Sequence, residues 1–185
     1  MIRLRIDDVM VKSEAWDKER SENRFKTIQQ WVNEAGGSVI HIPTILVGEI
    51  QDFPNTVEFI KEETARYRMF PEIHGWAHIN YDEVDEDEID RHLNFCLEWF
   101  RDVLNIRPGI WCLPWGGEGL PHVHSAANRA GLVVESVSHC ISPTEALQKL
   151  ETEGIDQFNY TILDHWWSKG NAIQRICKMV SDRTI

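Results

Sequence analysis

Two histidines stand four residues apart in the stretch from Glu72 to Tyr81, whose sequence is E-I-H-G-W-A-H-I-N-Y. In the first turn of a helix, or in a helix-like loop, His74 and His78 at this spacing lie on one face, so their ring nitrogens can reach a common divalent cation. Chance alone gives about 0.3 such pairs in a chain of 185 residues with 8 histidines. The pair therefore indicates a metal site only if the rest of the chain supplies a further ligand.

Two adjacent carboxylates, Asp7 and Asp8, follow the alternating stretch 2–6. Side chains alternate along a strand, so the two carboxylates point in different directions and can act differently. Asp8 with His74 and His78 makes a set of two histidines and one carboxylate, which leaves coordination positions open for water and substrate. Asp7 could then take a proton from metal-bound water. The alternative is an Asp pair that caps a loop or a helix.

Strand-like stretches alternate with helical periodicity along the whole chain. We expect strands at 2–6, 38–47, 69–74, 109–113, 132–137 and 160–163. We expect helices that end at 36–37, open at Pro54, run from the acidic stretch 82–88 to Leu104, end at 130–131, and cover 143–150 and 171–180. This alternation predicts an α/β fold in which a parallel sheet has helical crossovers, either barrel-like or doubly wound. The chain shows no repeat or linker, so residues 1–185 are predicted to form a single domain.

Side chains that can bind a metal ion, transfer a proton or contact a ligand fall where the expected strands end. Asp7 and Asp8 end the first strand, His74 the third, the turn 114–116 the fourth, and His165 the last. In both fold types ligands bind at the carboxyl ends of the strands, so these side chains are expected to meet.

Composition excludes several classes of partner. A net charge of −11 disfavours nucleic acid and anionic membrane surfaces, which require clustered Lys and Arg. The beginning of the sequence reads as a strand and not as a signal peptide, and no stretch is apolar for long enough to span a membrane. A cytoplasmic location is expected, since four widely spaced cysteines favour free thiols in a reducing compartment: Cys96, Cys112, Cys140 and Cys177.

Four segments, in order along nearly the whole chain, resemble motifs of the polysaccharide deacetylase family of metal-dependent carbohydrate esterases. I-D-D-V at 6–9 resembles the family's F-D-D-G motif, and E-I-H-G-W-A-H at 72–78 resembles H-[S/T]-x-x-H. W-C-L-P-W-G at 111–116 resembles R-x-P-Y-G, and I-L-D-H at 162–165 is similar to I-L-x-H. The resemblance implies an irregular (β/α) barrel of about seven parallel strands.

The resemblance also implies an activity, namely metal-dependent removal of an N-acetyl group from a saccharide or glycoconjugate. Asp7 would be the catalytic base, and His165 the general acid that protonates the leaving amine. Asp8, His74 and His78 would hold one divalent ion. Zinc is expected first, and cobalt, nickel, manganese or iron also suit such a ligand set.

The chain departs from the family pattern at several positions. Cys112 stands where the third motif normally has an arginine that orients the base, so that interaction is either lost or supplied from elsewhere, with Arg107 as a candidate. Val9 replaces a glycine, and Gly75 replaces the Ser or Thr of the second motif. The fourth motif, an Asp that tunes the catalytic histidine, has only weak candidates: Glu135, His139 and Asp164.

Aromatic side chains beside the motifs are candidates for contact with a sugar ring. Trp115, Gly116, Trp76 and Trp166 are predicted to bind substrate, although large aromatics also close barrel mouths without touching a ligand. The pair at 122 and 124 is either an accessory metal site or, as we favour, a solvated helix start.

Three functions remain open from the sequence. The first is hydrolysis of an N-acetylated sugar, and the second is C–N hydrolysis of a non-sugar amide. The third is a catalytically impaired relative that binds metal or carbohydrate. The oligomeric state is open as well.

Overall fold

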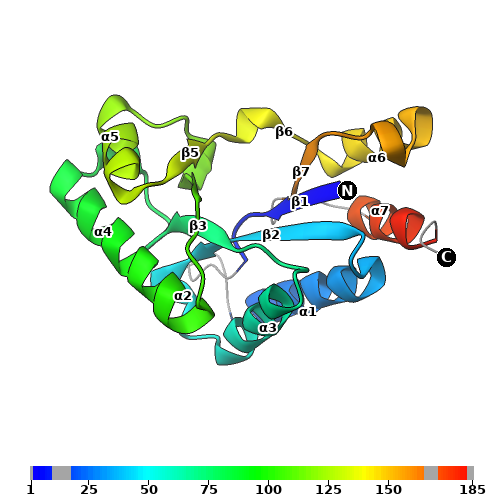
Figure 1. The fold of residues 1–185 in the computed structure, drawn as a ribbon, viewed down its shortest axis with the longest axis horizontal. Coiled ribbons are helices and arrows are strands. Elements are labelled where there is room, and N and C mark those ends of the chain that lie inside the picture. Colours follow the sequence, from blue (N-terminus) through cyan, green and yellow to red (C-terminus); the bar gives the residue numbers. More distant parts are fainter. Residues whose placement is uncertain (1, 10–17, 165–170, 183–185) are drawn as a thin grey trace.

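A computed structural model describes residues 2–9, 18–164 and 171–182 (Figure 1). The described strands form one parallel sheet of seven, in the order β5-β4-β3-β2-β1-β7-β6. They are β1 (Ile2–Ile6), β2 (Val39–Leu46), β3 (Glu72–Gly75), β4 (Ile110–Cys112), β5 (Val133–Glu135), β6 (Cys140–Ile141) and β7 (Thr161–Asp164). The sheet curls into a half-barrel whose two edges are β5 and β6. This confirms the predicted α/β fold, an irregular barrel of about seven parallel strands.

Helices connect the strands and cover the outer face of the sheet. They are α1 (Lys18–Ala35), α2 (Val47–Ile50), α3 (Pro54–Ala65), α4 (Glu86–Trp99), α5 (Pro121–Ala130), α6 (Pro143–Glu153) and α7 (Ala172–Ser181). In Figure 1, α1 and α3 lie below the central strands, α4 and α5 to the left, and α6 and α7 to the right. Helix α1 packs beside α7, and α4 packs beside α5.

The alternation in β1 decides which residues enter the core. Ile2, Leu4 and Ile6 are at most 2% exposed and belong to the hydrophobic core beneath the helices. Successive side chains of a strand point to opposite faces, so Arg3 and Arg5 project from the concave face of the half-barrel. Arg3 is exposed there, whereas Arg5 is fully buried.

Helix α1 ends where its glycine predicts. Gly36 has φ of +55°, and its N–H donates to the carbonyl of Val32 at 3.1 Å. A left-handed glycine directly after a helix is a common stop because it lacks a Cβ. The expected apolar face of this helix is confirmed, since Ile28, Trp31 and Val32 are buried.

The acidic start of α4 is confirmed as a solvated helix start. The carboxylate of Asp85 accepts from the backbone N–H of Glu88 at 2.9 Å, and the acidic side chains that follow lie in the first turn. Negative charge at this position is favoured by the helix dipole. The helix differs from expectation at its other end, because a π-helix occupies Phe100–Leu104, and Asn105 closes it with φ of +54°.

Two further differences concern short elements. The expected second strand was too long, because helix α2 begins at Val47 and its buried Val47 and Ile50 continue the apolar run. Strand β6 was missed, because two residues are too few to show a period. No helix in the described part of the chain is long and apolar enough to cross a membrane.

Candidate metal centre

The carboxyl ends of the central strands bring the predicted ligands together. Asp7 and Asp8 directly follow β1, and His74 lies in β3, two strands away in the sheet. His78 lies in the bend after β3, so the histidine pair is carried by a strand end and a loop rather than by a helix. Parallel strands end at one edge of the sheet, which is why residues far apart in sequence meet there.

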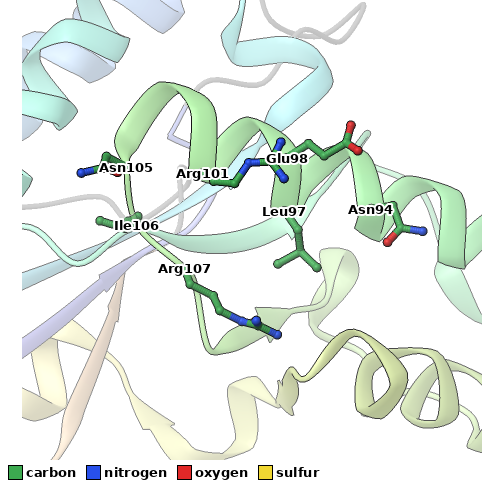
Figure 2. Close-up of a pocket in the computed structure, with 7 residues that line it drawn as sticks. All are labelled: Asn94, Leu97, Glu98, Arg101, Asn105, Ile106 and Arg107. Atoms are coloured by element: carbon green, nitrogen blue, oxygen red, sulfur yellow. The ribbon is translucent and has the colours of Figure 1, made fainter.

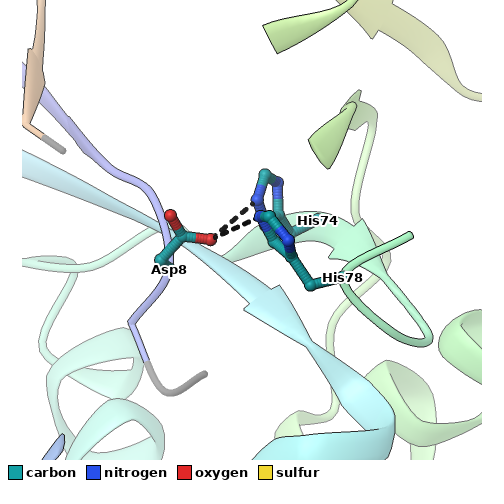
Figure 3. A group of neighbouring side chains, drawn as sticks. All are labelled: Asp8, His74 and His78. Atoms are coloured by element: carbon teal, nitrogen blue, oxygen red, sulfur yellow. Dashed lines mark hydrogen bonds and ion pairs between the residues drawn. The ribbon is translucent and has the colours of Figure 1, made fainter. Parts of the chain in front are cut away.

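Asp8, His74 and His78 converge on one point (Figure 3). The Nε2 atoms of the two histidines lie 3.1 and 3.2 Å from Oδ1 of Asp8. One potential ligand atom from each residue lies within 4.8 Å of the others. Two imidazole nitrogens and one carboxylate oxygen so close together fit a single divalent ion with open coordination positions.

Asp8 leaves the strand geometry to reach this position. Its φ is +55°, in the left-handed region, which Asp tolerates better than most residues. Asp7, the residue before it, continues the alternation of β1. The two adjacent carboxylates therefore contact different side chains: Asp7 contacts Arg5, and Asp8 contacts the two histidines. Burial alone would raise the pKa of Asp8, but hydrogen bonds from His74 and His78 outweigh it and hold that pKa well below its usual value.

His74 is oriented by its second ring nitrogen. Nδ1 lies 2.7 Å from the carbonyl oxygen of Cys112, and a carbonyl only accepts, so Nδ1 carries the proton. Nε2 is then the nitrogen that donates to Asp8, and once it gives up that proton for a metal ion its lone pair faces the triad while Nδ1 stays protonated, which is the arrangement that metal-binding histidines commonly have. Burial lowers the pKa of His74, but the carboxylates of Asp8 and Asp7 raise it by more than burial lowers it. The net effect is a pKa above the usual value.

The loop that carries His78 is folded tightly. A Cβ on Gly75 would lie 2.8 Å from the hydroxyl oxygen of Tyr81, so the glycine that replaces a Ser or Thr here lets the loop pack on that ring. The hydroxyl of Tyr81 accepts from the N–H of Trp76 at 3.0 Å, and the N–H of Gly48 donates to the carbonyl of Trp76 at 2.8 Å. These contacts hold the histidine pair in place.

Asp7 lies beside the triad in a separate network. Nε and Nη2 of Arg5 donate to its two carboxylate oxygens at 2.7 and 2.9 Å, and the hydroxyl of Thr44 donates to Oδ1 at 3.0 Å. Asp7 is 3% exposed. Its carboxylate is therefore fixed by three hydrogen bonds, two of them from a charged guanidinium.

The guanidinium beside Asp7 comes from a residue that we did not predict. The suggestion of Arg107 is wrong, because its Nη2 donates to the carbonyl of Ala130 at 3.3 Å on the exposed side of the molecule. A signal was present in the sequence, since Arg5 and Asp7 are two residues apart, and side chains at that spacing point to the same side of an extended chain. In the sequence alone, Arg5 is one of two polar residues in the alternating stretch 2–6.

The aromatic candidates have different surroundings. Trp115 is 74% exposed, has φ of +64°, and its ring lies 5.0 Å from that of His78, so it overhangs the triad. Gly116 follows it with φ of +68°, and a Cβ there would lie 3.1 Å from Val137. The ring of Trp76 instead lies 5.4 Å from that of Phe95 on α4.

The remaining site predictions divide into two groups. His165 and Trp166 lie outside the described residues. Of the weak candidates for the fourth motif, Asp164 pairs with Arg24 at 2.5 Å, His139 is exposed, and Glu135 lies 3.5 Å from Arg5. His122 and His124 lie in the first turn of α5, and within the described residues they belong to no cluster of three potential metal ligands.

A pocket of about 420 Å³ lies elsewhere, on α4 and the π-helix (Figure 2). Its lining shares no residue with the triad or with Asp7: Asn94, Leu97, Glu98, Arg101, Asn105, Ile106 and Arg107. It therefore contributes nothing to the candidate metal centre.

Comparison with solved structures identifies the class of fold. Peptidoglycan deacetylase PdaC from Bacillus subtilis superimposes with a TM-score of 0.63 and 16% identity, over 98% of this chain and 83% of its own. A family 4 carbohydrate esterase from Streptomyces lividans, in complex with acetate, gives 0.65 and 13% over 98% and 85%. A CE4-family pseudoenzyme from Bacillus anthracis gives 0.63 and 14% over 99% and 59%.

These similarities define a polysaccharide-deacetylase-like fold that covers nearly the whole chain. In the sequence comparisons, no family model and no curated protein matches. At this level of identity the likeness establishes the fold, and the function must be argued from the site.

Proposed function

We propose that this protein is a metal-dependent hydrolase that removes an N-acetyl group from a saccharide or glycoconjugate. The observation that carries the proposal is the convergence of Asp8, His74 and His78 beside a separately fixed carboxylate, Asp7. Deacetylases of the same fold support the choice of substrate class.

Asp8, His74 and His78 would hold the ion, and the donor set suits zinc first, with cobalt, nickel, manganese or iron as alternatives. Such an ion supplies Lewis acidity to the acetyl carbonyl and lowers the pKa of a bound water. The tautomer of His74, fixed by the carbonyl of Cys112, presents the lone pair that this binding needs.

Asp7 would accept the proton of the attacking water, for which its buried, hydrogen-bonded carboxylate is suitably held. A backbone N–H near Trp115 would donate to the oxyanion. His165 would protonate the leaving nitrogen as the C–N bond breaks, which releases acetate and a free amine. Trp115, exposed above the triad, offers an indole face for a sugar ring, with Gly116 next to it, and Trp166 remains a further proposed contact.

The test is acetate release from N-acetylated chito-oligosaccharides by metal-loaded protein, by chelated protein and by protein reloaded with zinc. We expect release that disappears with the metal and returns with it. A matched assay uses an N-acetylated amine without a sugar ring, and preferential turnover of that compound would favour the C–N hydrolase of non-sugar amides.

A catalytically impaired relative is the second candidate. It is favoured by the cysteine at position 112 and by the pseudoenzyme among the similar folds, for which a mutant with restored enzymatic activity is also known. Binding of zinc and of chito-oligosaccharide without acetate release, at saturating metal, would support it.

A cytoplasmic location stays a prediction. It rests on the free thiols, of which Cys96, Cys112 and Cys177 are buried. Cell fractionation with an antibody against the protein tests it.

A further inference from the structure

Arg5 is a buried cation whose contacts are directed at the proposed base. Its side chain is 0% exposed, and it engages both oxygens of Asp7 through Nε and Nη2. Two parallel N–H···O bonds from a planar guanidinium fix both the position and the rotation of a carboxylate. A single point charge would fix only its distance.

The same guanidinium reaches toward position 112 on a strand three places away. Nη1 of Arg5 lies 3.5 Å from Oε2 of Glu135, and Sγ of Cys112 lies 3.7 Å from that same oxygen. Arg5 and Cys112 therefore approach a common point on the concave face of the half-barrel. A long side chain at position 112 would enter the space that Arg5 now fills.

Cys112 cannot itself provide the charge. A thiol is neutral when protonated and negative when deprotonated, so it does not offer Asp7 the positive charge of a guanidinium. Its carbonyl oxygen remains useful, because it accepts from Nδ1 of His74. The backbone of residue 112 thus serves the ligand, while its side chain leaves room for Arg5.

We propose that Arg5 is the positioning residue for Asp7, and that it supplies from β1 the guanidinium that is missing at position 112 of β4. This inference rests on the proposed function, in which Asp7 acts as the base. It predicts that the guanidinium can be moved between the two strands as long as one copy faces Asp7.

The central experiment compares four variants with the wild type: Arg5→Lys, Arg5→Leu, Arg5→Leu combined with Cys112→Arg, and the control Arg3→Leu. We expect kcat for acetate release to fall about 100-fold in Arg5→Leu, the size of loss that follows misplacement of a catalytic group. Arg5→Lys should lose less, because it keeps the charge without the fork. The double variant should regain at least tenfold over Arg5→Leu.

Arg3→Leu is the matched control, since it removes an exposed arginine from the same face of the same strand. Its kcat should stay within threefold of the wild type. All variants should bind one zinc or cobalt ion per chain, because the three ligands are unchanged. Wild-type kcat in Arg5→Leu, or a folded double variant no more active than Arg5→Leu, overturns the proposal.

A measurement independent of turnover separates this proposal from the proposed function. The Nε–H of Arg5 should give a slowly exchanging resonance in proton–nitrogen NMR spectra, absent in Arg5→Lys and shifted in Asp7→Asn. If the wild type releases no acetate while this signal is present, the proposed function fails and the fixation of Asp7 by Arg5 stands. If the Nε–H resonance exchanges rapidly and does not shift in Asp7→Asn, Arg5 does not pair with Asp7, and the proposal is overturned even if the enzyme is active. If Arg5→Leu does not fold, the kcat of Arg5→Lys and the NMR signal of the wild type still test whether Arg5 positions Asp7.

Discussion

Two histidines are buried in neighbouring strands, and they differ in what surrounds them. His41 lies near the beginning of β2 and is 0% exposed, while His74 lies near the end of β3 and is 2% exposed. Burial lowers the pKa of His41 to about 4, because the backbone groups of Arg68 and Val39, and the carboxylate of Glu63 that is itself paired with Arg68, offset only part of the cost of burial. The same burial is outweighed at His74 by carboxylates.

With His74 as the proposed metal ligand, the comparison shows that burial alone does not mark a functional histidine. A histidine inside a strand is a neutral packing residue unless carboxylates at the strand end face it. Position along the strand decides which case applies, since ligand sites in open α/β sheets lie at the carboxyl ends of the strands. The following predictions test that contrast between His41 and His74.

Removing His74 should have the largest effect. His74→Ala deletes one of three ligands, and since losing an outer-shell partner alone costs about 10–100-fold in metal affinity, we expect a loss of more than about 100-fold. Metal content after dialysis and isothermal titration with zinc measure it. His124→Ala is the control, because His124 contacts the carbonyl of Glu118 instead. Full zinc affinity in His74→Ala would remove the triad from consideration.

Asp7→Asn should separate binding from turnover. The variant keeps the ligands, so one metal ion per chain should remain, while kcat falls by about 10²–10⁴, the usual contribution of general base catalysis. Acetate release and metal analysis on the same sample give both values. Unchanged turnover would exclude Asp7 as the base.

His41 should affect the free energy of unfolding at acid pH and not metal binding. In the unfolded chain His41 binds a proton with a pKa near 6.5, and in the folded chain with a pKa of only about 4. Its contribution to the free energy of unfolding is therefore fully present above pH 6.5 and is lost as the pH falls toward 4. The loss amounts to about 3 kcal/mol at most. Urea unfolding of wild type and His41→Leu at pH 4.5 and 7.5 measures it, and the variant should show the smaller decrease. Loss of zinc binding in His41→Leu would break the contrast with His74.

Trp115 should give the smallest effect. Trp115→Ala removes an exposed indole that contacts only the edge of the triad, so KM should rise about fivefold, as for loss of roughly 1 kcal/mol of binding, with kcat nearly unchanged. Trp115→Phe is the matched control and should recover most of the change. A fall in kcat with constant KM would assign Trp115 a different role.

Local patterns predicted much of the fold and part of the site. The alternation in β1 and the helical period ending at Gly36 are properties of neighbouring residues, so the sequence alone was sufficient for them. Two-residue β6 and the start of α2 depend on pairing and packing with distant segments, which no local period records. The triad was predicted because its residues fall at the ends of expected strands and follow the order of the resembled motifs.

Arg5 was not predicted, and the reason is physical. A motif assigns a role to a position in the sequence, whereas the carboxylate of Asp7 responds to any guanidinium that reaches it in space. Strands β1 and β4 both face the interior of the half-barrel, so either can supply the charge. Side chains two residues apart on one strand are the pattern to examine when a motif residue is missing.

The bend between His74 and His78 has a kinetic consequence. Its backbone is held by two hydrogen bonds of Trp76, whose carbonyl accepts from the N–H of Gly48 and whose N–H donates to the hydroxyl of Tyr81. Metal uptake then orders almost no chain, and preorganised sites avoid that entropic cost. We expect the association rate to follow the rate at which each hydrated ion exchanges its water, so that nickel enters far more slowly than zinc. Stopped-flow mixing with the two ions would measure this difference.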